Sequence, residues 1–141
     1  MNDSRSKERF LGFLNEEIHR RAPQGEAAVL KAFAAEVIGA MDFEDVRDRR
    51  PADVWASIHY AWRYLQQYDP AGSKISLFNP RFEQHGWTSR HTAVLVLTHG
   101  IPFVSESLRL ELNRRGIVIH MLVSSDLTVQ RDAGHELRQI Y

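Results

Sequence analysis

The residues best suited to bind a ligand form a short turn between an expected strand and an expected helix. The turn consists of His99, Gly100, Ile101, Pro102 and Phe103. Glycine allows another group to approach the backbone closely, and the start of a helix offers unpaired N–H groups and a positive dipole end to an anion. The sequence therefore predicts a candidate effector-binding site here, which could hold the carboxylate of an amino acid. The alternative is that Gly100 and Pro102 only make the turn tight.

Other reactive side chains lack the spacing that catalysis or metal binding needs. Ser105 and Ser107 follow His99, but no G-x-S-x-G elbow surrounds either serine. No two histidines form an H-x-x-x-H pair. His91, His99 and His120 lie in or beside two expected strands and could meet in the fold, although His120 is more simply explained as a partly buried strand residue with a hydrogen-bond partner. We predict no catalytic residue and no metal ligand. The histidines are at positions 19, 59, 85, 91, 99, 120 and 135.

The composition argues against several classes of partner and cofactor. Lys plus Arg and Asp plus Glu both total 18, and this balance argues against nucleic acid or an anionic membrane as the partner. There is no cysteine and no G-x-G pair, so neither a disulfide framework nor a dinucleotide cofactor is expected in these residues. No apolar run approaches the roughly 18 residues of a membrane span, and the polar start lacks the apolar region of a signal peptide. We therefore expect a cytoplasmic protein.

The first half of the chain, residues 1–70, is predicted to be a segment of about three helices. Helices are expected over residues 7–21, 26–41 and 51–68, where apolar residues recur at helical spacing. Pro51 suits the first turn of the third helix, because its missing N–H costs nothing there. Trp55 and Trp62 share one face of that helix and are expected to dock the helical part on the sheet, or on the rest of a larger protein. Adjacent carboxylates such as those at 16 and 17 point differently on a helix, so both are expected to be solvated.

The second half, residues 74–141, is predicted to be an α/β domain, because the apolar period changes after a turn at 69–73. Strands are expected over 74–78, 92–98, 117–123, 127–131 and 135–141, and a helix over 102–115. A strand, a helix and two antiparallel strands begin a ferredoxin-like unit. The expected fold class is therefore α+β, with N-terminal helices followed by a partial ferredoxin-like βαββ antiparallel sheet. The unit lacks its second helix and fourth strand, so the domain is expected to be truncated at its C-terminal end, with an uncovered face or edge.

Several short motifs follow one another in a fixed order. They are WRYL at 62–65, FNP at 78–80, GW at 86–87, HT at 91–92, PF at 102–103, LNRRG at 112–116 and V-x-H-x-L at 118–122. In order and spacing, this set resembles the N-terminal, ACT-like region of the large bacterial NAD-specific glutamate dehydrogenases. The resemblance covers roughly residues 40 to 131.

The resemblance implies catalysis by a longer parent enzyme and a non-catalytic role for this chain. The family oxidises L-glutamate to 2-oxoglutarate and ammonia with NAD, in a catalytic domain far downstream. ACT-like domains bind small effectors, at the turn that corresponds to residues 99–103, or pack subunits together. The expectation is a non-catalytic module for allosteric regulation or assembly, whose partners are the rest of the parent chain, its homo-oligomer and an amino-acid effector. A free-standing ACT-like sensor of amino acids is the alternative, and an enzyme complete within these residues is the weakest hypothesis.

Overall fold

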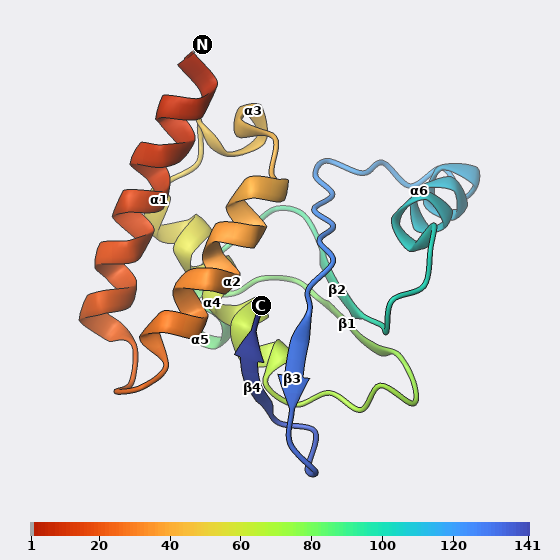
Figure 1. Cartoon of the computed structure of the whole chain (residues 1–141). Helices are drawn as coiled ribbons and strands as arrows, with labels where there is room; N and C mark the ends of the chain where they lie inside the picture. The colour runs from red at the N-terminus through yellow and green to blue at the C-terminus, as the bar shows by residue number, and fades with distance from the viewer. Residues whose placement is uncertain (1) are drawn as a thin grey trace.

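Three long helices form one side of the molecule. The computed structural model describes residues 2–141, beginning with α1 (Asn2–Arg21), α2 (Ala27–Ala40), the one-turn α3 (Phe43–Val46) and α4 (Pro51–Leu65) (Figure 1). The helical segment predicted from periodicity is thus confirmed. Pro51 lies in the first turn of α4, as expected. Asp42 caps α3 by accepting a 3.4 Å hydrogen bond from the Glu44 N–H.

The hydrophobic core lies between these helices. The ring centroids of Phe33 on α2 and Trp62 on α4 are 5.7 Å apart, and Trp55 is buried in the same cluster. The two tryptophans therefore pack α4 against the other helices, and the expectation that they dock it on the sheet is wrong. The reason is that they belong to the buried stripe of α4, which faces α1 and α2. The largest side chains buried completely are Leu14, Ile18, Leu30 and Ile58.

Strands β1 (Lys74–Phe78) and β2 (Ala93–Leu97) form an antiparallel pair beside the helices. The register pairs Ile75 with Val96 and Leu77 with Val94, so these four side chains share one face of the sheet. The other face is turned toward the helices, because its residue Leu97 packs against the helical core. The sheet therefore has an inner face on the core and an outer face without a helix of the N-terminal layer on it.

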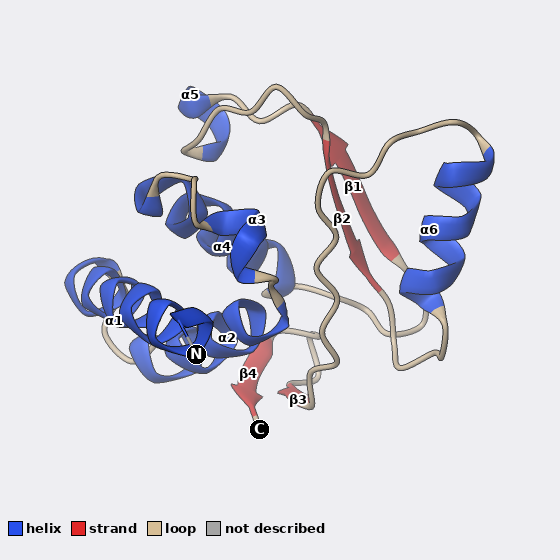
Figure 2. Cartoon of the chain, turned by 90° about the horizontal axis from the view of Figure 1, so that it is seen from above, coloured by secondary structure: helices blue, strands red, loops and turns tan. Residues whose placement is uncertain are grey.

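Two helices flank this sheet. The four-residue α5 (Phe82–His85) was not predicted, because one turn is too short to show periodicity; it ends at Gly86, whose φ of 88° suits glycine. Helix α6 (Val104–Arg114) confirms the helix predicted over 102–115. It closes where the Ile117 N–H donates to the Leu112 carbonyl at 2.9 Å, next to Gly116 at φ 72°. Both ribbon views place α6 on the opposite side of β1 and β2 from the long helices (Figure 2).

The prediction of a strand over residues 117–123 is wrong. These residues belong to no strand ladder, and the strands form two separate two-stranded sheets in place of one βαββ sheet. An alternation of apolar residues does not by itself provide a strand with a pairing partner. In this segment it is not matched by burial either, because Ile117, Val118 and Met121 are exposed, while Val123 packs against the helical core.

The second sheet is a C-terminal hairpin that lies on the helices. Strands β3 (Val129–Arg131) and β4 (Leu137–Ile140) pair antiparallel, and the turn predicted at 132–134 joins them. Leu137 is only 8% exposed within the helical core, and its N–H donates to the Gln66 carbonyl at 2.9 Å. The α+β class is confirmed, because helices and small antiparallel sheets occur in one chain. The division between residues 1–70 and 74–141 stays a prediction.

Candidate functional site

The predicted effector turn connects β2 to α6. All five residues from His99 to Phe103 are exposed. A Cβ added to Gly100 would meet no atom within 4 Å. No other part of residues 2–141 therefore approaches Gly100 closely enough to require a glycine there. Phe103 adopts φ 64° and forms the N-cap of α6 without a side-chain cap, and its carbonyl accepts from the Ser107 N–H at 2.9 Å. The turn thus presents the start of α6 to solvent, and effector binding there stays a prediction.

Two of the histidines considered for metal binding do meet. The rings of His91 and His120 stack with centroids 3.8 Å apart and planes 25° apart. His120 is exposed, so the expectation of a partly buried strand residue is wrong; no ladder forms at 117–123 to bury it. Across residues 2–141, no group of three or more His, Cys, Asp or Glu side chains could hold a metal ion. Over the same residues, no helix has the length and apolar character to cross a membrane.

An aromatic cluster fixes the sheet and α5 on the helical layer. Tyr60 of α4 lies 4.8 Å from Phe78 of β1 and 5.1 Å from His85 of α5, measured between ring centroids. Trp87 packs edge-on against Phe78 at 6.0 Å. The stretch 78–87, which carries part of the motif set, is therefore used for packing.

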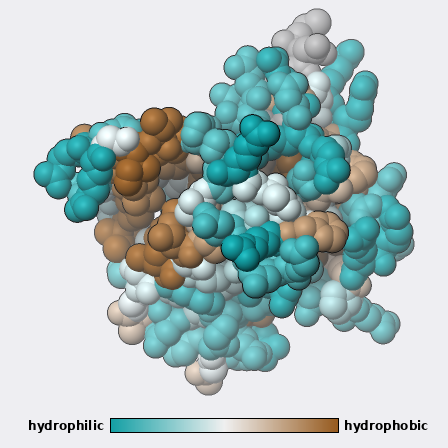
Figure 3. All heavy atoms as spheres, turned by 180° about the vertical axis from the view of Figure 1, so that it is seen from behind, coloured by the Kyte–Doolittle hydropathy of each residue, from teal (hydrophilic) through white to brown (hydrophobic). Residues whose placement is uncertain are grey.

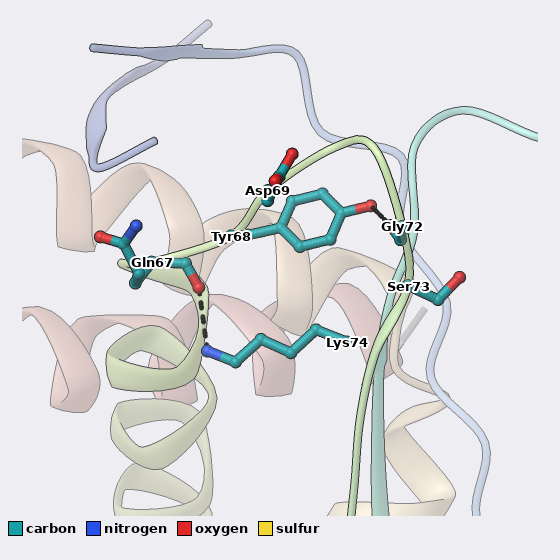
Figure 4. A pocket seen from close by; sticks show the side chains of 6 residues that line it. All are labelled: Gln67, Tyr68, Asp69, Gly72, Ser73 and Lys74. Atoms are coloured by element: carbon teal, nitrogen blue, oxygen red, sulfur yellow. Dashed lines mark hydrogen bonds between the residues drawn. The ribbon is translucent and has the colours of Figure 1, made fainter. Parts of the chain in front are cut away.

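The C-terminal end of α4 forms a junction between the helices and both sheets. Lys74 of β1 donates to the carbonyls of Tyr64 and Gln67, both at 2.9 Å. Tyr68 donates from its hydroxyl to the Gly72 carbonyl at 2.6 Å. Burial, and then the charge of Arg131, lower the pKa of Lys74. Figure 4 shows Gln67, Tyr68, Gly72 and Lys74 at the edge of a shallow pocket of about 350 Å³. The Lys74 ammonium and the Tyr68 hydroxyl already donate to backbone carbonyls. We therefore interpret the pocket as a structural junction. Its lining residues are Gln67, Tyr68, Asp69, Gly72, Ser73 and Lys74.

A second hollow, of about 410 Å³, is a groove between α1, α4 and α5. Glu17 in its wall is only 6% exposed, so the expectation that this carboxylate is solvated is wrong. Its two oxygens pair with Arg20 and Arg21, the latter at 2.9 Å. Sequence analysis missed the groove, although Glu17 occupies a core position of α1 between Leu14 and Ile18 and precedes two arginines at i+3 and i+4. We call this hollow the α1–α4–α5 groove. Its lining residues are Phe13, Glu17, Arg21, Ala52, Trp55, Ala56, His59, Phe82, His85 and Gly86.

The surroundings of His59 predict that the stability of the fold depends on pH. Burial first, and then the charges of Arg63 and Arg21 against that of Glu26, lower the pKa of this histidine. The folded chain therefore holds the proton more weakly than the unfolded chain, so stability falls as pH drops below the usual value of about 6.5. We expect the thermal midpoint to fall between pH 7 and roughly pH 5.5, and His59→Gln to reduce that fall. The control His19→Gln, at an exposed histidine of α1, should keep it; equal falls in all three proteins would contradict the assignment.

The outer face of the first sheet is apolar and exposed. We define this outer sheet face by Ile75, Leu77, Val94 and Val96, of which the first three are 66%, 71% and 45% exposed. Leu110 on α6 is 71% exposed. Seen from behind, apolar atoms gather on the side of the molecule that carries β1, β2 and α6 (Figure 3). Monomeric proteins rarely leave a contiguous apolar patch uncovered, and such patches mark surfaces of interaction.

Comparison with known proteins agrees with the resemblance and extends it. Residues 33–141 match the family described as the glutamate dehydrogenase ACT1 domain. An NAD-specific glutamate dehydrogenase of Halomonas elongata is 39% identical over 131 residues, which are 93% of this chain and 8% of that protein. The one of Pseudomonas aeruginosa is 40% identical over 108 residues, 77% of this chain and 7% of that protein. The chain thus spans less than a tenth of the length of these relatives. No solved structure matches it. Because the family match covers most of its residues, the chain belongs to the ACT1 domain family of glutamate dehydrogenase.

Proposed function

We propose that this chain is a regulatory or assembly module of an NAD-dependent glutamate dehydrogenase and is not catalytic by itself. The parent enzyme would oxidise L-glutamate to 2-oxoglutarate and ammonia with NAD, in the cytoplasm, and NAD would bind outside this chain. Family membership and the names of two relatives support the parent activity. Their much greater length disfavours the alternative of a free-standing amino-acid sensor.

The outer sheet face is the observation that carries the role in assembly. Burial of apolar surface stabilises by about 25 cal/mol per Å², so side chains as exposed as Ile75 and Leu77 favour a covered state. A surface of this kind fits the rest of the parent subunit or a neighbouring subunit of a homo-oligomer. An amino-acid effector at residues 99–103 is compatible with the same contact, because the exposed turn would receive its second wall from the covering element.

A charge on the outer sheet face tests this proposal. Leu77→Lys should leave the thermal midpoint of the 141-residue chain nearly unchanged, because the side chain is already exposed. In the full-length parent enzyme, the same change should weaken assembly, measured by sedimentation velocity, and lower glutamate oxidation. The control is Gln139→Lys, at an exposed strand position of the other sheet. A full-length Leu77→Lys enzyme with wild-type assembly and activity would sink the proposal.

A further inference from the structure

The α1–α4–α5 groove combines a positive side chain with an apolar bed. Arg21 reaches it from the last turn of α1. Trp55 and His59 of α4 stack with centroids 5.2 Å and planes 13° apart, and Phe13 of α1 and Phe82 of α5 also line the groove. The groove lies among the helices, away from the outer sheet face and from the turn before α6. The residues that line the groove include none of the outer sheet face and none of the turn at 99–103.

We propose that the α1–α4–α5 groove binds a small carboxylate that carries an apolar body, with the carboxylate at Arg21 and the body against Trp55 and the two phenylalanines. Nothing in the proposed assembly role requires this site. The groove's volume of about 410 Å³ lies within the range of roughly 300–1,000 Å³ typical of small-molecule sites.

The charges around Glu17 favour an anion over a cation. This carboxylate is buried and holds two guanidinium groups, Arg20 and Arg21, so one positive charge remains in excess. Its contact with the Arg21 Nε at 2.9 Å orients the guanidinium, whose planar fork suits a second carboxylate. A ligand ammonium would instead have to displace an arginine from Glu17. The ring of His59 beside it adds a hydrogen-bonding group at the same wall.

The other end of the groove selects an apolar body. Its floor is the face of α4 that carries Trp55 and Ala56, and the Phe82 side chain beside it is 66% exposed. Gly86 sets the width at this end, because a Cβ there would lie 3.3 Å from the Ala56 Cβ. An aromatic or branched aliphatic body would bury apolar surface against these side chains.

In the first test, the 141-residue chain is titrated with 3-phenylpropionate as the probe, and binding is monitored by ¹H–¹⁵N NMR. We expect saturable shifts at the backbone amides of 13–21, 52–59 and 82–86, with an affinity in roughly the millimolar range for a ligand of this size. The neutral isostere 3-phenylpropan-1-ol should bind at least about tenfold more weakly, since it has no charge for Arg21. 3-Phenylpropylamine should bind as weakly as the alcohol, or more weakly. This comparison of ligands uses the wild-type chain, so its result does not depend on whether a variant folds.

A matched pair of variants tests the role of Arg21. Arg20 and Arg21 both pair with Glu17, and their side chains are 66% and 63% exposed, but only Arg21 lines the groove. Arg21→Met should weaken 3-phenylpropionate binding by about tenfold or more, and Arg20→Met by less than about twofold. Equal losses in both variants, equal affinity for acid and alcohol, or no saturable shifts in the groove would each overturn the proposal. Shifts confined to residues 99–103 would overturn it too and would support the turn as the effector site.

Discussion

Replacing Leu137 with aspartate should unfold the helices of the N-terminal half together with the hairpin that carries this residue. Leu137 is 8% exposed and belongs to the same core as Leu30 and Trp62, and β4 lies against α2. A carboxylate at that position would lose its hydration without gaining a partner. The cost should be about 4 kcal/mol or more, because burying an unpaired charge is among the most destabilising substitutions. Urea unfolding followed by helical circular dichroism measures it.

The same experiment decides how the chain is divided into domains. If residues 1–70 and 74–141 fold independently, Leu137→Asp should leave the helical transition where it is in the wild type. If the hairpin completes the helical core, the whole transition should move to lower urea. The control Gln139→Asp, two residues along the same strand and exposed, should have an effect below about 0.5 kcal/mol. A separate, unshifted helical transition in Leu137→Asp would contradict the single core.

The helices were predictable because their signals are local. Periodic apolar residues defined α1, α2 and α4, and Pro51 fixed the start of α4. Strands β1 and β2 were also found, since a change of period and a continuous apolar run are visible in a short window. These features depend on residues within a few positions of one another, and the structure keeps them all.

Pairing and burial were harder, because they depend on residues far apart in the chain. Residues 117–123 have a strand pattern without a strand partner, and the burial of Glu17 depends on the packing of α1 within the helical core. The candidate site divides in the same way. The turn at 99–103 was located from sequence alone, whereas the α1–α4–α5 groove joins three segments that are up to 73 positions apart, from Phe13 to Gly86, and no local pattern brings them together.

Arg131 holds the hairpin to the end of α4, and Arg131→Met should destabilise the chain by about 2–3 kcal/mol. Its guanidinium donates to the carbonyls of Leu65, Gln66 and His135 at 2.9, 3.2 and 3.0 Å. The carbonyls at the end of a helix lack intrahelical partners, and a cation at that end also meets the negative pole of the helix dipole. Methionine would keep much of the apolar contact and remove the guanidinium from all three oxygens. The Gln66 carbonyl would keep the Leu137 N–H and the His135 carbonyl the Tyr68 N–H, so the Leu65 carbonyl at the end of α4 would lose most. Thermal and urea unfolding would measure the loss.

The comparison that isolates this effect is Arg115→Met on α6. Arg115 pairs with Glu111 at 2.6 Å, but its side chain is 65% exposed, so the pair should contribute less than about 1 kcal/mol. Lys74→Met should fall between the two, because Lys74 bonds two carbonyls of the same helix end. An Arg131→Met variant no less stable than Arg115→Met would mean that water replaces the guanidinium at the end of α4. The expected order, with Arg131 first, Lys74 second and Arg115 last, follows from the number of backbone carbonyls that each cation bonds: three for Arg131 and two for Lys74, whereas Arg115 pairs with the Glu111 carboxylate.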